Sequence, residues 1–259
     1  MEEPPVLLET RDARGVVTLT LNRPQAFNAL SEALIDALHR TADRLAADET
    51  LRAVVIAGAG KAFCAGHDLR QMRATPSQAY YAELFARCSA MMRALHQLPV
   101  PVIARVHGIA TAAGCQLVAL CDLAVAARDA RFATSGIDVG LFCATPSVTL
   151  SRNVSRKAAF EMLVTGDFID ADTARERGLV NRVATPEHID AEVQALLARI
   201  LDKPRIALEM GKALFYRQLE AGLDAALDDA GRTMACNMAH ETALEGVQAF
   251  LDKRPPAWR

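Results

Sequence analysis

Short apolar runs alternate with amphipathic stretches through the first half of the chain. β-branched alternation and continuous apolar runs indicate strands, and apolar residues recurring every three to four positions indicate helices. The predicted strands are residues 15–21, 53–57, 100–106 and 123–127, and the predicted helices are residues 31–47, 77–97 and 112–121. Because short buried strands alternate with helices, this order predicts an α/β core with much parallel pairing.

Beyond residue 145 the strand signal nearly disappears and helical periodicity continues to the end. The helical segments are residues 145–164, 170–177, 186–201, 204–219 and 223–250, and one further strand is predicted at 180–183. No internal repeat, low-complexity tract or long linker separates the two halves. We therefore expect residues 1–195 to form the core, and residues 196–259 a helical region packed on that core or on a neighbouring subunit.

The charges of the chain nearly balance. Lys and Arg total 29 against 31 Asp and Glu, a formal net charge of −2. No overall field therefore draws the protein to nucleic acid or to an anionic membrane, and an acidic ligand must be held locally. Neither a signal peptide nor an apolar run of roughly 18 residues is present, so the sequence predicts a cytoplasmic protein.

Motifs for metal and phosphate binding can be tested and excluded. The six cysteines form no Cys-x-x-Cys pair, and we interpret them as small core residues. The six histidines lack ligand spacing, so no metal site is predicted. Residues 58–63 resemble two phosphate-binding motifs, but a dinucleotide fingerprint needs glycine at Phe63, and a P-loop needs glycine at Val55 and a hydroxyl at Ala62.

Two turns rich in glycine and alanine carry the candidate chemistry. Residues 61–69 (Lys-Ala-Phe-Cys-Ala-Gly-His-Asp-Leu) follow the strand at 53–57, and residues 107–117 (His-Gly-Ile-Ala-Thr-Ala-Ala-Gly-Cys-Gln-Leu) open the apolar helix. Two N–H groups from such turns can converge on one carbonyl oxygen, and the helix dipole favours an oxyanion there. One turn alone is more often a tight strand-to-helix connection, but two together favour an oxyanion hole.

These turns resemble the enoyl-CoA hydratase/isomerase (crotonase) superfamily. The resemblance runs from residues 22–30 (Asn-Arg-Pro-x-x-x-Asn-Ala-Leu) to residues 245–255 (Glu-Gly-Val-Gln-Ala-Phe-Leu-Asp-Lys-Arg-Pro), almost the whole chain. Residues 140–146 and 212–218 further resemble its enoyl-CoA hydratase domain-containing branch. The resemblance implies a spiral of ββα units with a helical C-terminal trimerisation region, assembled as a homotrimer or homohexamer. It also implies an acyl-CoA thioester ligand in fatty acid metabolism, with no cofactor besides the substrate's own coenzyme A.

The resemblance assigns roles to individual positions. The backbone N–H groups of His67 and Ala113 would bind the thioester oxygen. The adenine and pantetheine of coenzyme A would lie in a groove lined by Gln25, Ala26, Phe27, Ala65, Asp68 and Leu69. Lys253 would approach a phosphate, although an exposed tail lysine explains the same residue equally well.

Two positions depart from the hydratases of this superfamily, which carry two glutamates that hold water and transfer its proton. Gln116 and Gly136 occupy those positions here. Glutamine can hold water but cannot titrate, and glycine has no side chain. Since general acid–base catalysis contributes about 10²- to 10⁴-fold, we expect hydration to be slow. We interpret Asp138, two residues after Gly136, as structural, with a replacement carboxylate as the alternative.

Three functions remain open. The first is an enoyl-CoA hydratase-like lyase, with Asp68 or Asp138 as a replacement acid, and we take it as the nominal function. The second is a decarboxylase of a malonyl-type CoA thioester, because residues 65–68 resemble the turn of methylmalonyl-CoA decarboxylase and the departing carbon dioxide supplies the enolate's electrons. The third is a non-catalytic acyl-CoA-binding protein. An acid near Gln116 or Gly136 would favour the first, a polar slot the second, and an apolar or filled pocket the third.

Overall fold

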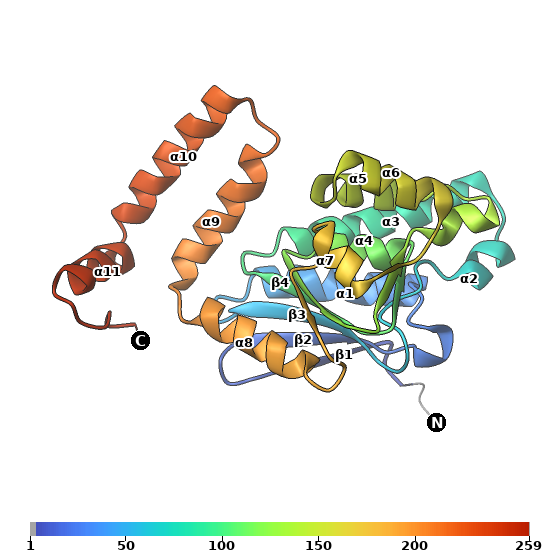
Figure 1. The fold of residues 1–259 in the computed structure, drawn as a ribbon, viewed down its shortest axis with the longest axis horizontal. Coiled ribbons are helices and arrows are strands. Elements are labelled where there is room, and N and C mark those ends of the chain that lie inside the picture. The colour runs from blue at the N-terminus through green and yellow to red at the C-terminus, as the bar shows by residue number, and fades with distance from the viewer. Residues whose placement is uncertain (1–3, 259) are drawn as a thin grey trace.

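The computed structural model describes residues 4–258 and contains a six-stranded main sheet in the order β1-β2-β3-β4-β6-β9 (Figure 1). Its strands are β1 (Leu7–Arg11), β2 (Val16–Leu21), β3 (Ala53–Gly58), β4 (Val102–Val106), β6 (Leu123–Ala127) and β9 (Arg182–Ala184). β1 pairs antiparallel with β2, and every other pair of neighbours is parallel. The predicted α/β core with parallel pairing is confirmed.

A second sheet of very short strands lies beside the main one. It has the order β5-β7-β8, and its strands are β5 (Ile109–Thr111), β7 (Arg131–Ala133) and β8 (Ile169–Asp170). The chain turns from β4 into β5, and from β6 into β7, within two or three residues, and each pair of strands is followed by a helix. These successive ββα units form the expected crotonase-like spiral. Sequence patterning missed β5, β7 and β8 because three residues are too few to show an alternation.

Helices cover the sheets and make up most of the second half. They are α1 (Glu32–Ala46), α2 (Leu69–Ala74), α3 (Gln78–His96), α4 (Ala113–Leu120), α5 (Ala144–Asn153), α6 (Arg156–Thr165), α7 (Ala171–Glu176), α8 (Ile189–Leu201), α9 (Arg205–Gln218), α10 (Leu223–Met238) and α11 (Glu241–Leu251). The chain also forms two 3-10 helices, η1 (Pro24–Ala26) and η2 (Ser135–Val139). The helix expected over 145–164 is broken before Ser155, and the one over 223–250 is broken at His240.

Apolar side chains are buried on both faces of the main sheet. Residues from β2, β3 and β4 pack with α1, α3 and α4 in the larger core, which includes Leu19, Leu34 and Met91. On the other face, Val55, Ile103 and Val125 pack against α8. Each such side chain contributes roughly 1.5–3 kcal/mol when fully buried. Because α8 is part of this second core, the expected boundary at residue 195 falls inside a helix that packs on the sheet.

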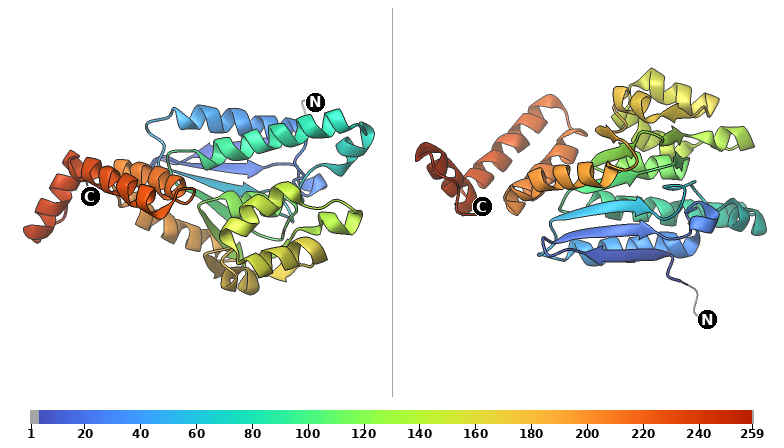
Figure 2. Two further views of the ribbon diagram at one scale, coloured as in Figure 1. Left: turned by 90° about the horizontal axis from the view of Figure 1, so that it is seen from above. Right: turned by 60° about the horizontal axis from the view of Figure 1, so that its bottom comes forward.

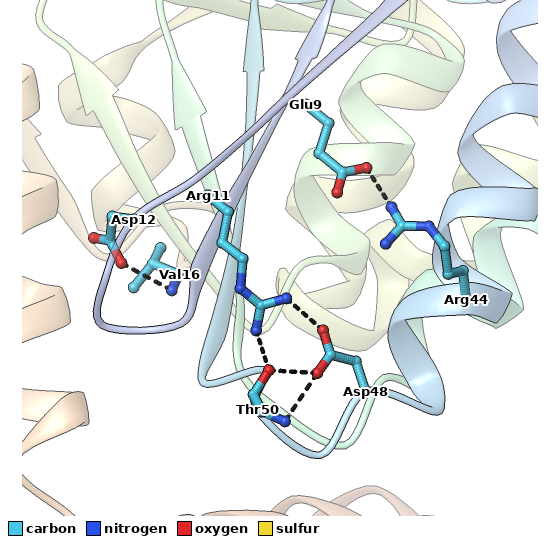
Figure 3. A network of polar contacts seen from close by, with 7 residues as sticks. All are labelled: Glu9, Arg11, Asp12, Val16, Arg44, Asp48 and Thr50. Carbon is cyan, nitrogen blue, oxygen red and sulfur yellow. Dashed lines mark hydrogen bonds and ion pairs between the residues drawn. The ribbon is translucent and has the colours of Figure 1, made fainter.

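β1 is an exposed edge strand that sequence patterning did not predict. Four of its five residues are exposed, so it lacks the alternation of a half-buried strand. Ion pairs join this strand to its surroundings, Glu9 to Arg44 and Arg11 to Asp48 (Figure 3). Exposed pairs of this kind contribute at most about 1 kcal/mol each, so β1 is held mainly by its backbone pairing with β2.

The last three helices, α9, α10 and α11, extend away from the sheets (Figures 1 and 2). Among the described side chains, none in α9 or α10 is buried, and Ala249 is the one buried in α11. Large apolar residues lie on the surface of these helices, including Leu223, Leu227, Met234 and Phe250. Such an apolar surface is typical of an interface with another protein surface.

Two further sequence expectations concern the cysteines and membrane-spanning helices. Five cysteines are buried as expected, but Cys236 on α10 is exposed, so its interpretation as a core residue was wrong. In the described structure no residue of α10 is buried, so Cys236 shares the exposure of its helix. In the described part of the chain, no helix combines the length and apolar character needed to cross a bilayer.

Candidate active site

The two glycine- and alanine-rich turns lie against each other. The Cys64 N–H donates to the Ile109 carbonyl at 3.1 Å, and the Thr111 N–H donates to the Cys64 carbonyl at 3.0 Å. A β-carbon on Gly114 would lie 2.1 Å from the Cys64 oxygen, so only glycine allows this approach. The first turn is thereby fixed as an additional strand-like segment beside β5.

Gly66 brings the first turn onto the start of α4. Its φ is +88°, and a β-carbon there would lie 2.8 Å from the Ala112 Cβ and 3.1 Å from the Ala113 nitrogen. Glycine is therefore required both for the backbone conformation and for the contact. His67, the next residue, consequently stands beside Ala113.

The backbone N–H groups of His67 and Ala113 are free to donate. Leu30 forms a parallel bridge with His67, in which the Leu30 N–H bonds to Gly66 and the Asp68 N–H bonds to Leu30. In such a bridge the middle residue directs its own N–H to the opposite side. Ala113 is the first residue of α4, so its N–H has no partner inside the helix. Within residues 4–258 neither N–H has an acceptor, as an oxyanion hole requires.

Ala112 carries the backbone strain of this site. Its φ of 50° and ψ of −121° lie in a region that favours glycine. Ala113 is helical and so donates its N–H without strain. A non-glycine residue in such a conformation costs roughly 1–3 kcal/mol, and the surrounding hydrogen bonds maintain it.

A mostly apolar cavity of about 220 Å³ opens at these two residues. It is lined by Ala65, His67, Leu69, Met72, Phe85, Ala112, Ala113, Ser135, Gly136, Val139, Leu141, Phe142, Cys143, Ala144, Thr145 and Pro146. Of the described residues, no Asp, Glu, Lys or Arg lines it. His67 and Cys143 are its titratable groups, and burial raises the pKa of the Cys143 thiol.

The imidazole of His67 is a feature that sequence reasoning missed. Burial lowers its pKa to about 4, so the ring is neutral near pH 7. The ring forms a T-shaped contact with Phe85, with ring centroids 5.1 Å apart. Its Nε2 atom is buried and has no hydrogen-bond partner among the described residues. The signal available in the sequence was a histidine at this position of the turn. The resemblance assigns a role only to the backbone N–H there, so the side chain received no attention.

The two positions without glutamate differ in their surroundings. Gln116 is buried on α4, three residues after Ala113, does not line the cavity, and its Oε1 has no partner among the described residues. Gly136 lines the cavity, but a β-carbon on it would lie 2.6 Å from the Leu141 oxygen and 2.8 Å from Cys143 Sγ. The loop after η2 therefore occupies the space that a side chain at position 136 needs.

A family model described as enoyl-CoA hydratase/isomerase matches residues 11–259. The chain belongs to this family. It is 42% identical over 257 residues to the mouse (Mus musculus) enoyl-CoA hydratase domain-containing protein 3, mitochondrial, covering 99% of this chain and 86% of that protein. The crystal structure of an enoyl-CoA hydratase from Mycobacterium smegmatis is similar at 67% identity, with a TM-score of 0.98 and coverage of 98% and 99%. That of human enoyl Coenzyme A hydratase domain-containing protein 3 has 40% identity, a TM-score of 0.94 and coverage of 98% and 100%.

These relatives confirm the predicted superfamily and its enoyl-CoA hydratase domain-containing branch. They also correct one expectation. The curated vertebrate relatives are mitochondrial by name, which contradicts the cytoplasmic location predicted from the sequence. That prediction was wrong because it rested on a missing signal peptide, and a missing signal peptide does not exclude other compartments.

Of the residues that the resemblance assigns to a coenzyme A groove, Ala65 and Leu69 line the cavity, and the binding of coenzyme A there stays a prediction. η1 carries Gln25 and Ala26, and the Ala65 N–H donates to the Phe27 carbonyl at 3.0 Å. Phe27 and Leu69 are both more than half exposed, so they offer apolar surface beside the cavity.

Neither alternative carboxylate lines the cavity. Asp68 caps α2 and accepts a 2.8 Å hydrogen bond from Arg23. Burial acts to raise its pKa, but the bonds from Arg23 and from the α2 N–H groups hold the pKa below its usual value. Asp138 is exposed, and its Oδ1 lies 2.7 Å from the position of a β-carbon on Gly166. Asp68 is therefore engaged as a helix cap, and the structural role of Asp138 stays a prediction.

Lys253 is not brought to the cavity within one chain. It follows α11, which lies at the opposite end of the molecule from α2 (Figure 1). Any contact with a phosphate would need a second subunit, which stays a prediction. In the described part of the chain, no group of three or more His, Cys, Asp or Glu could hold a metal ion.

Proposed function

We propose that this protein binds an acyl-CoA thioester, with the thioester oxygen held by the N–H groups of His67 and Ala113. The observation that supports this proposal is that two closely packed turns carry N–H groups without acceptors beside an apolar cavity. A donor of this kind stabilises the oxyanion of a transition state by roughly 2.7–4 kcal/mol. In the nominal reaction, an enoyl-CoA hydratase-like lyase adds water to the double bond, and negative charge accumulates on that oxygen.

The residues that line the cavity support an uncharged acyl group as its occupant. Of the described residues, none that lines the cavity carries a fixed positive charge, so a malonyl-type carboxylate would be buried without a cationic partner. The lack of a carboxylic acid at Gln116 and Gly136 supports slow hydration. The same lack favours the second candidate function, acyl-CoA binding without chemistry, and measured turnover separates the two.

A pair of matched ligands tests the proposal. Butyryl-CoA and the thioether butyl-CoA differ in the carbonyl oxygen, so calorimetry on both isolates the contribution of the two donors. We expect millimolar or tighter binding of the thioester, which is about 4 kcal/mol, and at least about tenfold weaker binding of the thioether. Ala113→Pro should reduce this ratio, because proline is tolerated at the first helical position but has no N–H.

Hydration of crotonyl-CoA gives the second readout. We expect turnover far below the 10² to 10³ per second, approximately, of efficient enzymes. Equal affinities for the thioester and the thioether would overturn the oxyanion hole. Hydration at the rate of efficient enzymes would instead show that an acid group has been overlooked.

A further inference from the structure

One side chain of the cavity is a neutral base near pH 7. His67 lines the cavity and is neutral there, whereas burial keeps Cys143 a thiol. Gln116 cannot titrate, and Gly136 has no side chain. Asp68 and Asp138 do not line the cavity. The described residues therefore leave the imidazole as the candidate for proton transfer.

The same ring has an unmet hydrogen-bonding requirement. Its Nε2 is buried without a partner among the described residues, and a buried nitrogen left without a hydrogen bond is destabilising. The neighbour on one side is the Phe85 ring, which has no nitrogen or oxygen to form a conventional hydrogen bond. A buried polar group left unsatisfied beside a cavity is a feature that occurs at functional sites.

His67 would contribute two groups to the proposed complex, its backbone N–H and its ring, which lines the cavity. In the proposed complex, the His67 N–H holds the thioester oxygen. The α-carbon of the acyl group is bonded to the same carbonyl carbon, so it lies next to the residue whose N–H binds the oxygen. The ring of His67 lines the cavity in which the acyl group would lie.

We propose that the imidazole of His67 transfers the α-proton of the bound acyl thioester, in place of the two family glutamates. A ring nitrogen takes the proton, and the C–H electron pair becomes the C=C bond of the enolate. The carbonyl π pair moves onto the oxygen, where the N–H groups of His67 and Ala113 hold it. The imidazolium returns a proton to the same carbon, so nothing is oxidised or reduced. This inference rests on the proposed function.

Exchange of the α-proton with D₂O tests the step directly. The full-length protein is incubated with butyryl-CoA in D₂O, and deuterium at the α-carbon is followed by mass spectrometry. We expect exchange in the wild type and a loss of at least about 10²-fold in His67→Ala, which keeps the backbone N–H but removes the ring. His67→Phe repeats the test with the ring volume retained. His39→Ala, at a partly exposed histidine of α1, is the matched control and should exchange normally.

The pH profile distinguishes this base from an ordinary histidine. Because burial lowers the pKa of His67 to about 4, the exchange rate should stay level from pH 8 down to about pH 5 and fall only below it. No Asp, Glu, Lys or Arg among the described residues lining the cavity would add a second titration, and Cys143 stays protonated over this range.

The outcomes separate the two proposals. Equal exchange in wild type and His67→Ala overturns the role of the imidazole, and so does a wild type that prefers the thioester over the thioether yet exchanges nothing. Equal affinity for thioester and thioether overturns the proposed function itself. Both His67 variants should keep the thioester preference, because their backbone N–H remains.

Discussion

Lys212 Nζ lies 2.7 Å from Asp122 Oδ2, although the two residues are 90 positions apart. The two side chains are 10% and 13% exposed, so this ion pair is largely buried. The Tyr216 hydroxyl donates to the other oxygen of Asp122, and the Val102 N–H donates to Oδ2. One carboxylate thus connects α9 to the starts of β4 and β6.

We predict that Lys212→Met destabilises the protein by about 3–5 kcal/mol, because the substitution leaves Asp122 buried without a cation. Urea unfolding at a fixed protein concentration measures the change. Lys203→Met is the matched control, since Lys203 is half exposed and its pairing with Asp202 is a surface contact worth at most about 1 kcal/mol. Adding Asp122→Asn to Lys212→Met should recover part of the loss. A loss below about 1 kcal/mol in Lys212→Met would contradict the prediction.

The sequence predicted those parts of the fold in which one local pattern determines the structure. The apolar run at 53–57 is β3, and Ser31 and Ser77 cap α1 and α3 where the helices were expected to begin. β1 was missed because an exposed edge strand has no apolar alternation. The breaks at Ser155 and His240 were missed because helical periodicity continues across them.

The site was predictable only as far as backbone and small residues define it. Glycine and alanine in the two turns indicated the approach of His67 to Ala113, which Gly66 makes possible. The filling of the space beside Gly136 was not predictable, because it depends on how the loop carrying Leu141 folds back. The unpartnered imidazole nitrogen was hidden for the same reason, since burial is a property of the packed structure.

We predict that the chain assembles as a trimer or hexamer through α9, α10 and α11. Leu227, Met234 and Phe250 are each more than 60% exposed, and burying such side chains against a neighbouring subunit would contribute roughly 1.5–3 kcal/mol apiece. Light scattering at micromolar concentration measures the mass. A monomer would contradict the prediction, and it would also exclude delivery of Lys253 to the cavity of a neighbouring subunit.

Gly66→Ala should separate the two turns. The new β-carbon would lie 2.8 Å from the Ala112 Cβ at a φ of +88°, so we expect a loss of more than about 1 kcal/mol and a reduced preference for the thioester over the thioether. Gly140→Ala is the matched control for stability. Its φ of +79° imposes similar backbone strain, but no atom lies within 4 Å of the added carbon. If both variants lose the same stability in urea unfolding, contact between the turns is not what makes Gly66 necessary.

Restoring the family glutamates should not restore fast hydration. Gly136→Glu places a side chain where the Leu141 oxygen and Cys143 Sγ already lie, and overpacking of this kind costs typically about 1–3 kcal/mol. We therefore expect Gly136→Glu combined with Gln116→Glu to lower the melting temperature and to raise crotonyl-CoA hydration by less than about 10²-fold, the lower end expected of general acid–base catalysis.

Gln116→Glu alone is the control for this pair, because it adds no volume. Its carboxyl group would be buried without a partner in the described structure, so its pKa should rise and leave much of it protonated near neutral pH. A folded double variant with a gain of about 10²-fold or more would show that the loop carrying Leu141 moves aside readily. The scaffold would then be a hydratase that has lost only its acids, and the imidazole of His67 would be unnecessary for proton transfer.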